Sequence, residues 1–123
     1  GFGIPPASLD QMRETFTSCR ATDDDAASVM QRINDRSQML IDPHTAVALH
    51  AAQQLRQDGE LTGPVVTLAT AHPAKFPDAV FEAAGVRPAL PGRLGNLFKL
   101  DERLTSLAAD ADIVKQFIRA RAI

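Results

Sequence analysis

Two short stretches carry the side chains that can do chemistry in this chain. Residues 42–45 (Asp-Pro-His-Thr) place a carboxylate, an imidazole and a hydroxyl close together. Residues 70–76 (Thr-Ala-His-Pro-Ala-Lys-Phe) add a second hydroxyl, a second imidazole and an ammonium group. Purely structural roles are equally open for the two leading residues, because Asp42 can cap a helix and Thr70 can bond to backbone. The two stretches are nevertheless the candidate site.

The second stretch follows a run that predicts a buried β-strand, Pro64–Thr70. The run has no charge and is rich in β-branched and small residues, a pattern typical of a strand covered on both faces. Ligands of open α/β sheets bind beyond the carboxyl ends of the strands, where the Thr70 hydroxyl would emerge. A lone buried strand cannot satisfy its own backbone groups, so we expect its sheet to come from elsewhere. The chain is therefore expected to be a piece of something larger.

Helices account for most of the remaining chain. Capping signals predict helix starts at Ser8, at Thr22 (with Asp25 as reciprocal partner), at Asp42 and at Asp110. Another helix is predicted over about 77–84, ended by Gly85, with a helical turn or two near 94–98 and a possible edge strand at 102–107. The expected buried faces are Val29, Met30 and Ile33 in the second helix, and Ile113, Phe117 and Ile118 in the last.

The composition and charge of the chain exclude several classes of function. The 123 residues fit one domain, and a net charge of −2 provides no electrostatic footprint for nucleic acid or an anionic membrane. No signal peptide opens the chain and no apolar run is long enough for a membrane helix, so we expect a cytoplasmic protein. The three histidines have no zinc-ligand spacing, and we expect no metal site. The only cysteine, Cys19, lies on an apolar stripe and is expected to be an inert buried thiol.

The two stretches, with their flanks, resemble the C-terminal part of threonine synthase. The matching segments are Leu40–Ala48 (Leu-Ile-Asp-Pro-His-Thr-Ala-Val-Ala) and Leu68–Phe76 (Leu-Ala-Thr-Ala-His-Pro-Ala-Lys-Phe), in the right order and at the right spacing. The capped helix pair before them and the tail from Glu102 to Ile118 also look similar. The resemblance covers nearly the whole chain, and its second segment is specific.

The resemblance implies a fold type II enzyme that uses pyridoxal 5′-phosphate (PLP). Such an enzyme converts O-phospho-L-homoserine and water to L-threonine and phosphate. The expected fold class is α/β, a mostly helical fragment (residues 1–123) that contributes one buried strand to the large domain. In the family the hydroxyl at the position of Thr70 hydrogen-bonds the pyridine nitrogen of the cofactor. Asp42, His44, His72 and Lys75 are implied to contact substrate or to support the cofactor.

The family's Schiff-base lysine has no counterpart here. The chain contains only Lys75, Lys99 and Lys115, and none stands in the Schiff-base motif, which the resemblance puts upstream. We therefore expect no catalytic residue in these residues, no activity from them alone, and the upstream part of the enzyme as their partner. Two alternatives are a stand-alone helical interaction domain without cofactor, and another fold type II lyase or dehydratase.

Overall fold

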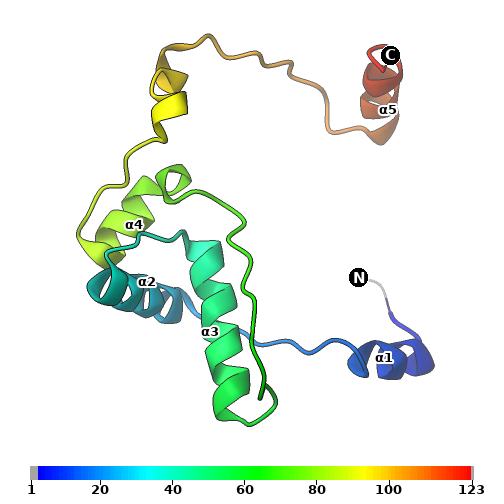
Figure 1. Cartoon of the computed structure of the whole chain (residues 1–123). Coiled ribbons are helices and arrows are strands. Elements are labelled where there is room, and N and C mark those ends of the chain that lie inside the picture. The colour runs from blue at the N-terminus through cyan, green and yellow to red at the C-terminus, as the bar shows by residue number, and fades with distance from the viewer. Residues whose placement is uncertain (1–2, 123) are drawn as a thin grey trace. The chain divides into compact units, whose positions relative to one another are not determined.

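The computed structural model describes residues 3–122 and divides into two compact units, which meet in sequence between Leu90 and Pro91. The first unit contains four α-helices and a 3₁₀-helix: α1 (Pro6–Arg13), α2 (Asp23–Ser37), α3 (Pro43–Gln57), η1 (Pro73–Lys75) and α4 (Pro77–Ala84). Helix α2 packs against both α3 and α4, and η1 contacts α4 (Figure 1). The predominance of helix agrees with the sequence.

The helix ends follow from local capping chemistry. Thr22 and Asp25 form a reciprocal capping box at the start of α2, as predicted. Asp42 caps α3, and Pro43 takes the first helical position, where a missing N–H costs nothing. Helix α4 ends at Gly85, whose φ of 70° lies in the left-handed region that favours glycine. The start of α1 departs from prediction, because this helix begins at Pro6 and Ser8 lies inside it.

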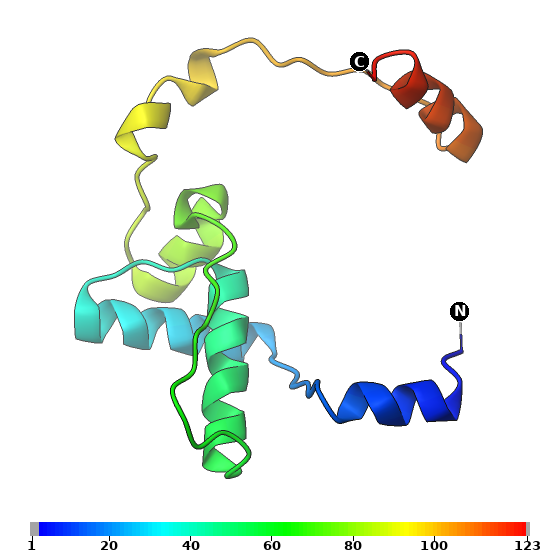
Figure 2. The same ribbon diagram turned by 45° about the vertical axis from the view of Figure 1, so that its right-hand side comes forward.

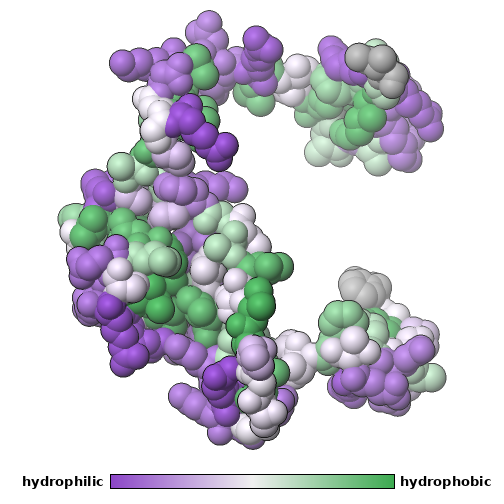
Figure 3. Space-filling model, viewed as in Figure 1, coloured by the Kyte–Doolittle hydropathy of each residue, from purple (hydrophilic) through white to green (hydrophobic). Residues whose placement is uncertain are grey.

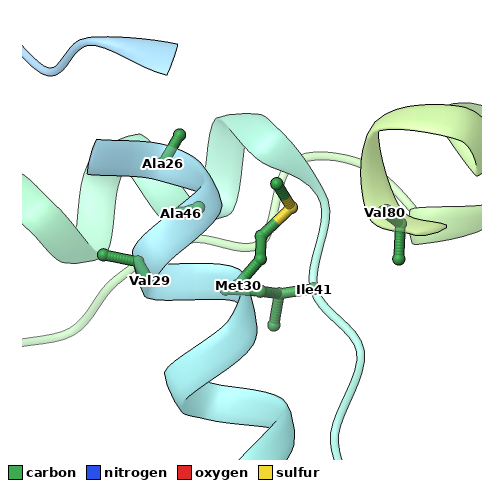
Figure 4. Packing of buried hydrophobic residues seen from close by; sticks show 6 residues of the cluster. All are labelled: Ala26, Val29, Met30, Ile41, Ala46 and Val80. Atoms are coloured by element: carbon green, nitrogen blue, oxygen red, sulfur yellow. The ribbon is translucent and has the colours of Figure 1, made fainter. Parts of the chain in front are cut away.

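One small hydrophobic core holds the first unit together. Its buried side chains come from α2, α4, the start of α3 and the residue Ile41 that precedes α3; they are Ala26, Val29, Met30, Ile41, Ala46 and Val80 (Figure 4). Val29 and Met30 confirm the predicted buried face of α2, and Ile33 packs partly buried against the same cluster. The core therefore fixes α3 and α4, the two helices that flank the candidate residues.

The segment Pro64–Thr70 is not a β-strand here. Residues 3–122 contain no strand, and this segment is irregular chain that runs alongside α3 (Figures 1 and 2). Its side chains are not covered on both faces, since Val66 is 86% and Leu68 is 72% exposed. A strand exists only when neighbouring strands take its backbone hydrogen bonds, and the described residues supply none. The strand that the α/β fold class assigned to this segment is thus absent from residues 3–122.

The second unit contains η2 (Gly92–Leu94), η3 (Leu97–Lys99) and α5 (Ala111–Arg119). Asp110 caps α5 through the N–H groups of Asp112 and Ile113, as predicted, whereas residues 102–107 form no strand. The prediction that α5 buries one face is wrong: Ile113 is 42% and Ile118 57% exposed, and no residue of α5 is buried. Apolar side chains therefore lie at the surface in both units (Figure 3). Every helix within residues 3–122 is too short or too polar to span a bilayer.

Candidate functional site

The buried carboxylate of Asp42 organises the first stretch. Its side chain is fully buried. Oδ1 accepts the backbone N–H of His44 at 2.9 Å and lies 3.1 Å from His44 Nδ1, while Oδ2 accepts the hydroxyl of Thr45. Both carboxylate oxygens therefore have partners from the first turn of α3. This geometry arises because Asp42 has extended backbone angles just before the helix, which turns its side chain back onto the free N–H groups.

The protonation state of Asp42 follows from these contacts. Burial opposes the charged form, but the hydrogen bonds from Thr45 and His44 outweigh it and hold the pKa of Asp42 below its usual value. The carboxylate is consequently ionised at neutral pH. A buried negative charge thus lies beside the imidazole of His44, whose side chain is 62% exposed.

The second stretch forms a short capped turn. His72 Nδ1 accepts the backbone N–H of Ala74 at 3.1 Å, so this imidazole caps η1. The Lys75 side chain is exposed, and its Nζ lies 5.7 Å from the centre of the Phe76 ring. His72 and Lys75 therefore have local structural contacts, and Phe76 leads directly into α4.

The two stretches meet in space. The rings of His44 and Phe76 lie 4.9 Å apart between centroids, tilted by 50°. His44 and Thr70 line one open groove of about 440 Å³ between α3 and the segment 61–70. A groove of this size accommodates a small metabolite. The groove thus brings together Thr70 and His44, with Asp42 behind His44; His72 and Lys75 do not line it.

Two contributions to this site were missed by sequence reasoning. The sequence shows Phe76 only as the last residue of the second stretch, although its ring is the direct link between the two stretches. The groove is also lined by three alanines of α3: Ala48, Ala51 and Ala52. The high alanine content of this helix was the feature of the sequence that could have indicated a groove there. No cluster of metal-ligating side chains occurs within residues 3–122. Cys19 is partly buried, with its Sγ 3.9 Å from the carbonyl oxygen of Ala51.

Comparison with known proteins decides the family. Residues 45–118 match the family model described as threonine synthase, C-terminal. The chain belongs to the threonine synthase family. Threonine synthase of Pseudomonas aeruginosa is 39% identical over 109 residues, which is 88% of this chain and 23% of that protein. Threonine synthase of Corynebacterium glutamicum is 38% identical over 84% of this chain and 21% of its own length.

A solved threonine synthase structure supports the same assignment. The crystal structure of PLP-bound threonine synthase from Brucella melitensis superimposes with a TM-score of 0.72 at 37% identity, covering 97% of this chain and 25% of that one. The chain therefore spans about a quarter of the length of the threonine synthases it matches. The resemblance to the C-terminal part of threonine synthase is confirmed.

Proposed function

We propose that this chain acts as the C-terminal part of a threonine synthase, which converts O-phospho-L-homoserine and water to L-threonine and phosphate. Membership of the family supports the reaction, and the groove shared by Thr70 and His44 is the observation that supports the site. The rest of the enzyme supplies the Schiff-base lysine in this proposal. The chain alone is then inactive.

The residues of the groove fit PLP as the cofactor. Thr70 is exposed, and its hydroxyl is a neutral group that can donate to or accept from a ring nitrogen. In this proposal Thr70 holds the pyridine nitrogen, while Asp42 and His44 support the cofactor from α3. PLP supplies an electron sink when bound. A hydroxyl partner, unlike a carboxylate, leaves the ring nitrogen largely unprotonated and so moderates that sink.

His72 and Lys75 have a different place in the proposal. His72 caps the turn that follows Thr70, and Lys75 is an exposed cation next to that turn. They support the loop, and Lys75 additionally assists an anionic group of the substrate. The location of both residues one turn after Thr70 is the basis for this assignment.

A chimeric enzyme tests the proposed function. The segment of Pseudomonas aeruginosa threonine synthase that aligns with this chain is replaced by its 123 residues. We expect the chimera to release threonine and phosphate from O-phospho-L-homoserine, and the 123 residues alone to release neither. A chimera that folds and binds PLP yet produces no threonine would contradict the proposal.

Thr70→Ala is the sharper variant within this chimera. We expect it to lower the turnover number at least tenfold while the melting temperature stays the same, because Thr70 is exposed. Thr70→Ser keeps the hydroxyl and should retain most activity. The control is Thr62→Ala, which changes an exposed threonine of the same segment, 61–70, that does not line the groove. Equal turnover numbers for Thr70→Ala and Thr62→Ala would remove Thr70 from the site.

A further inference from the structure

The imidazole of His44 is more than part of a helix cap. Capping of α3 requires the Asp42 carboxylate and the backbone N–H of His44, and the hydroxyl of Thr45 satisfies the second carboxylate oxygen. The ring makes an additional contact, with Nδ1 3.1 Å from Asp42 Oδ1. Any residue except proline at position 44 would leave the backbone cap intact. The cap therefore does not account for an imidazole at this position.

The contact with Asp42 fixes which nitrogen carries the proton. An ionised carboxylate only accepts hydrogen bonds, so Nδ1 must donate to it. In the neutral imidazole Nε2 is then the nitrogen with the free lone pair. The hydrogen bonds that hold Asp42 ionised thereby also hold His44 in one tautomer.

The ring of His44 is also fixed in direction. The buried carboxylate holds it at Nδ1, and Phe76 packs against it at 4.9 Å between ring centroids. The side chain stays 62% exposed and lines the groove that Thr70 also lines. A ring that is held at one nitrogen and accessible elsewhere is suited to proton transfer at its other nitrogen.

We infer that His44 is the proton acceptor of this groove and that Asp42 is the positioning residue that fixes its tautomer. The inference rests on the proposed function, whose reaction consumes water. The ligand of Nε2 is that water: its O–H bond breaks, the electron pair stays on oxygen, and the proton passes to Nε2. The oxygen bonds to a substrate carbon as the carbon–carbon double bond left by loss of phosphate opens, and it becomes the hydroxyl of threonine. The neighbouring carbon takes up a proton, and Nε2 releases its own proton to solvent. Asp42 adds a negative charge behind the ring, which favours this role over binding of the substrate phosphate.

The variant His44→Asn separates the two roles of the ring, which are the hydrogen bond from Nδ1 to Asp42 and the transfer of a proton at Nε2. The side-chain amide nitrogen of Asn occupies the place of Nδ1 and can donate to Asp42, but no atom replaces Nε2. In the chimeric enzyme we expect His44→Asn to lower kcat about 100-fold, the lower end of what general base catalysis contributes. The melting temperature should be unchanged. His50→Asn changes a histidine of the same helix that does not line the groove, and should keep wild-type kcat.

Two results of this kinetic test would overturn the inference. Wild-type kcat in His44→Asn would mean that the ring acts only through its bond to Asp42. An increase in KM for O-phospho-L-homoserine at unchanged kcat would mean that His44 binds the substrate phosphate. Both results require an active wild-type chimera, so they are distinct from failure of the proposed function, in which that chimera itself produces no threonine.

The tautomer of His44 provides a readout that does not depend on activity. Nitrogen-15 chemical shifts of the imidazole distinguish a protonated Nδ1 from a protonated Nε2. We expect His44 of the chimeric enzyme at pH 8 to carry its proton on Nδ1, and Asp42→Ala, which removes the accepting oxygen, to shift the ring toward the Nε2-protonated form. A wild-type ring protonated mainly on Nε2 would overturn the inference, whatever the kinetic result.

Discussion

Replacement of Asp42 by alanine should destabilise the first unit through two separate losses. Removal of a helix N-cap costs about 0.5–2 kcal/mol. The substitution also leaves the Thr45 hydroxyl without its partner, and because Thr45 is 5% exposed this costs about 1–3 kcal/mol. We expect the free energy of unfolding to fall by about 2–4 kcal/mol in total. Urea unfolding of the 123-residue chain at pH 7, followed by circular dichroism at 222 nm, measures this difference.

The same carboxylate predicts a dependence on pH. Because folding lowers the pKa of Asp42, its ionised form contributes stability that is present above the unfolded pKa and is lost as pH falls through the folded pKa. Asp42→Asn retains a capping oxygen but cannot ionise. The stability difference between wild type and Asp42→Asn should be constant from pH 7 to 5 and shrink below about pH 4.

The comparison with Asp42→Asn also cancels the contribution of a second carboxylate, Asp25, to the loss of stability in acid. The hydrogen bonds from the backbone and side chain of Thr22 lower the pKa of Asp25, so the wild type loses stability in acid through this residue too. Asp25 is present in both proteins and cancels in the difference. A loss below 0.5 kcal/mol for Asp42→Ala, or a difference between wild type and Asp42→Asn that does not change with pH, would refute the account of Asp42 as an ionised cap.

Two further substitutions test the packing. Val80→Ala removes two methyl groups from a fully buried side chain and should cost about 1.5–2.5 kcal/mol in urea unfolding, whereas Val86→Ala at an exposed site should cost less than about 0.5 kcal/mol. Similar costs for both would mean that the core is not formed. Phe117→Ala should cost less than about 1 kcal/mol, because the ring is only half-buried and its main partner is the Arg121 guanidinium, 3.8 Å from the ring centre. A loss of 3 kcal/mol or more in thermal unfolding would show that α5 does pack on a core.

Local chemistry made several features of the fold predictable. The caps at Thr22, Asp42 and Asp110 and the end of α4 at Gly85 depend on residues within one turn, so the sequence alone identifies them. Long-range partners decided the features that were predicted wrongly. A strand at 64–70 needs neighbouring strands, and the stripe on α5 needs a surface to cover it; neither is present among the described residues. The hydrophobic pattern of a segment indicates which face it can bury. It does not indicate whether another strand or helix is present to cover that face.

The candidate site shows the same division. The contact between Asp42 and His44 spans two positions at a helix start, so the motif itself suggested it. The contact between His44 and Phe76 joins residues far apart in the sequence, and depends on how the core orients α3 and α4. The roles of Thr70 in the groove and of His72 and Lys75 in the turn stay predictions that the proposed variants test.

The exposure of the second unit has a consequence for calorimetry. No residue of 91–122 is buried, so unfolding of this stretch exposes little new apolar surface and changes the heat capacity little. Helix α5 should then lose its helix gradually as temperature rises, since a short helix without tertiary packing has no sharp transition. The heat absorbed in a single cooperative peak would come from the α2, α3 and α4 helices alone. Its enthalpy should accordingly match a chain much shorter than 123 residues.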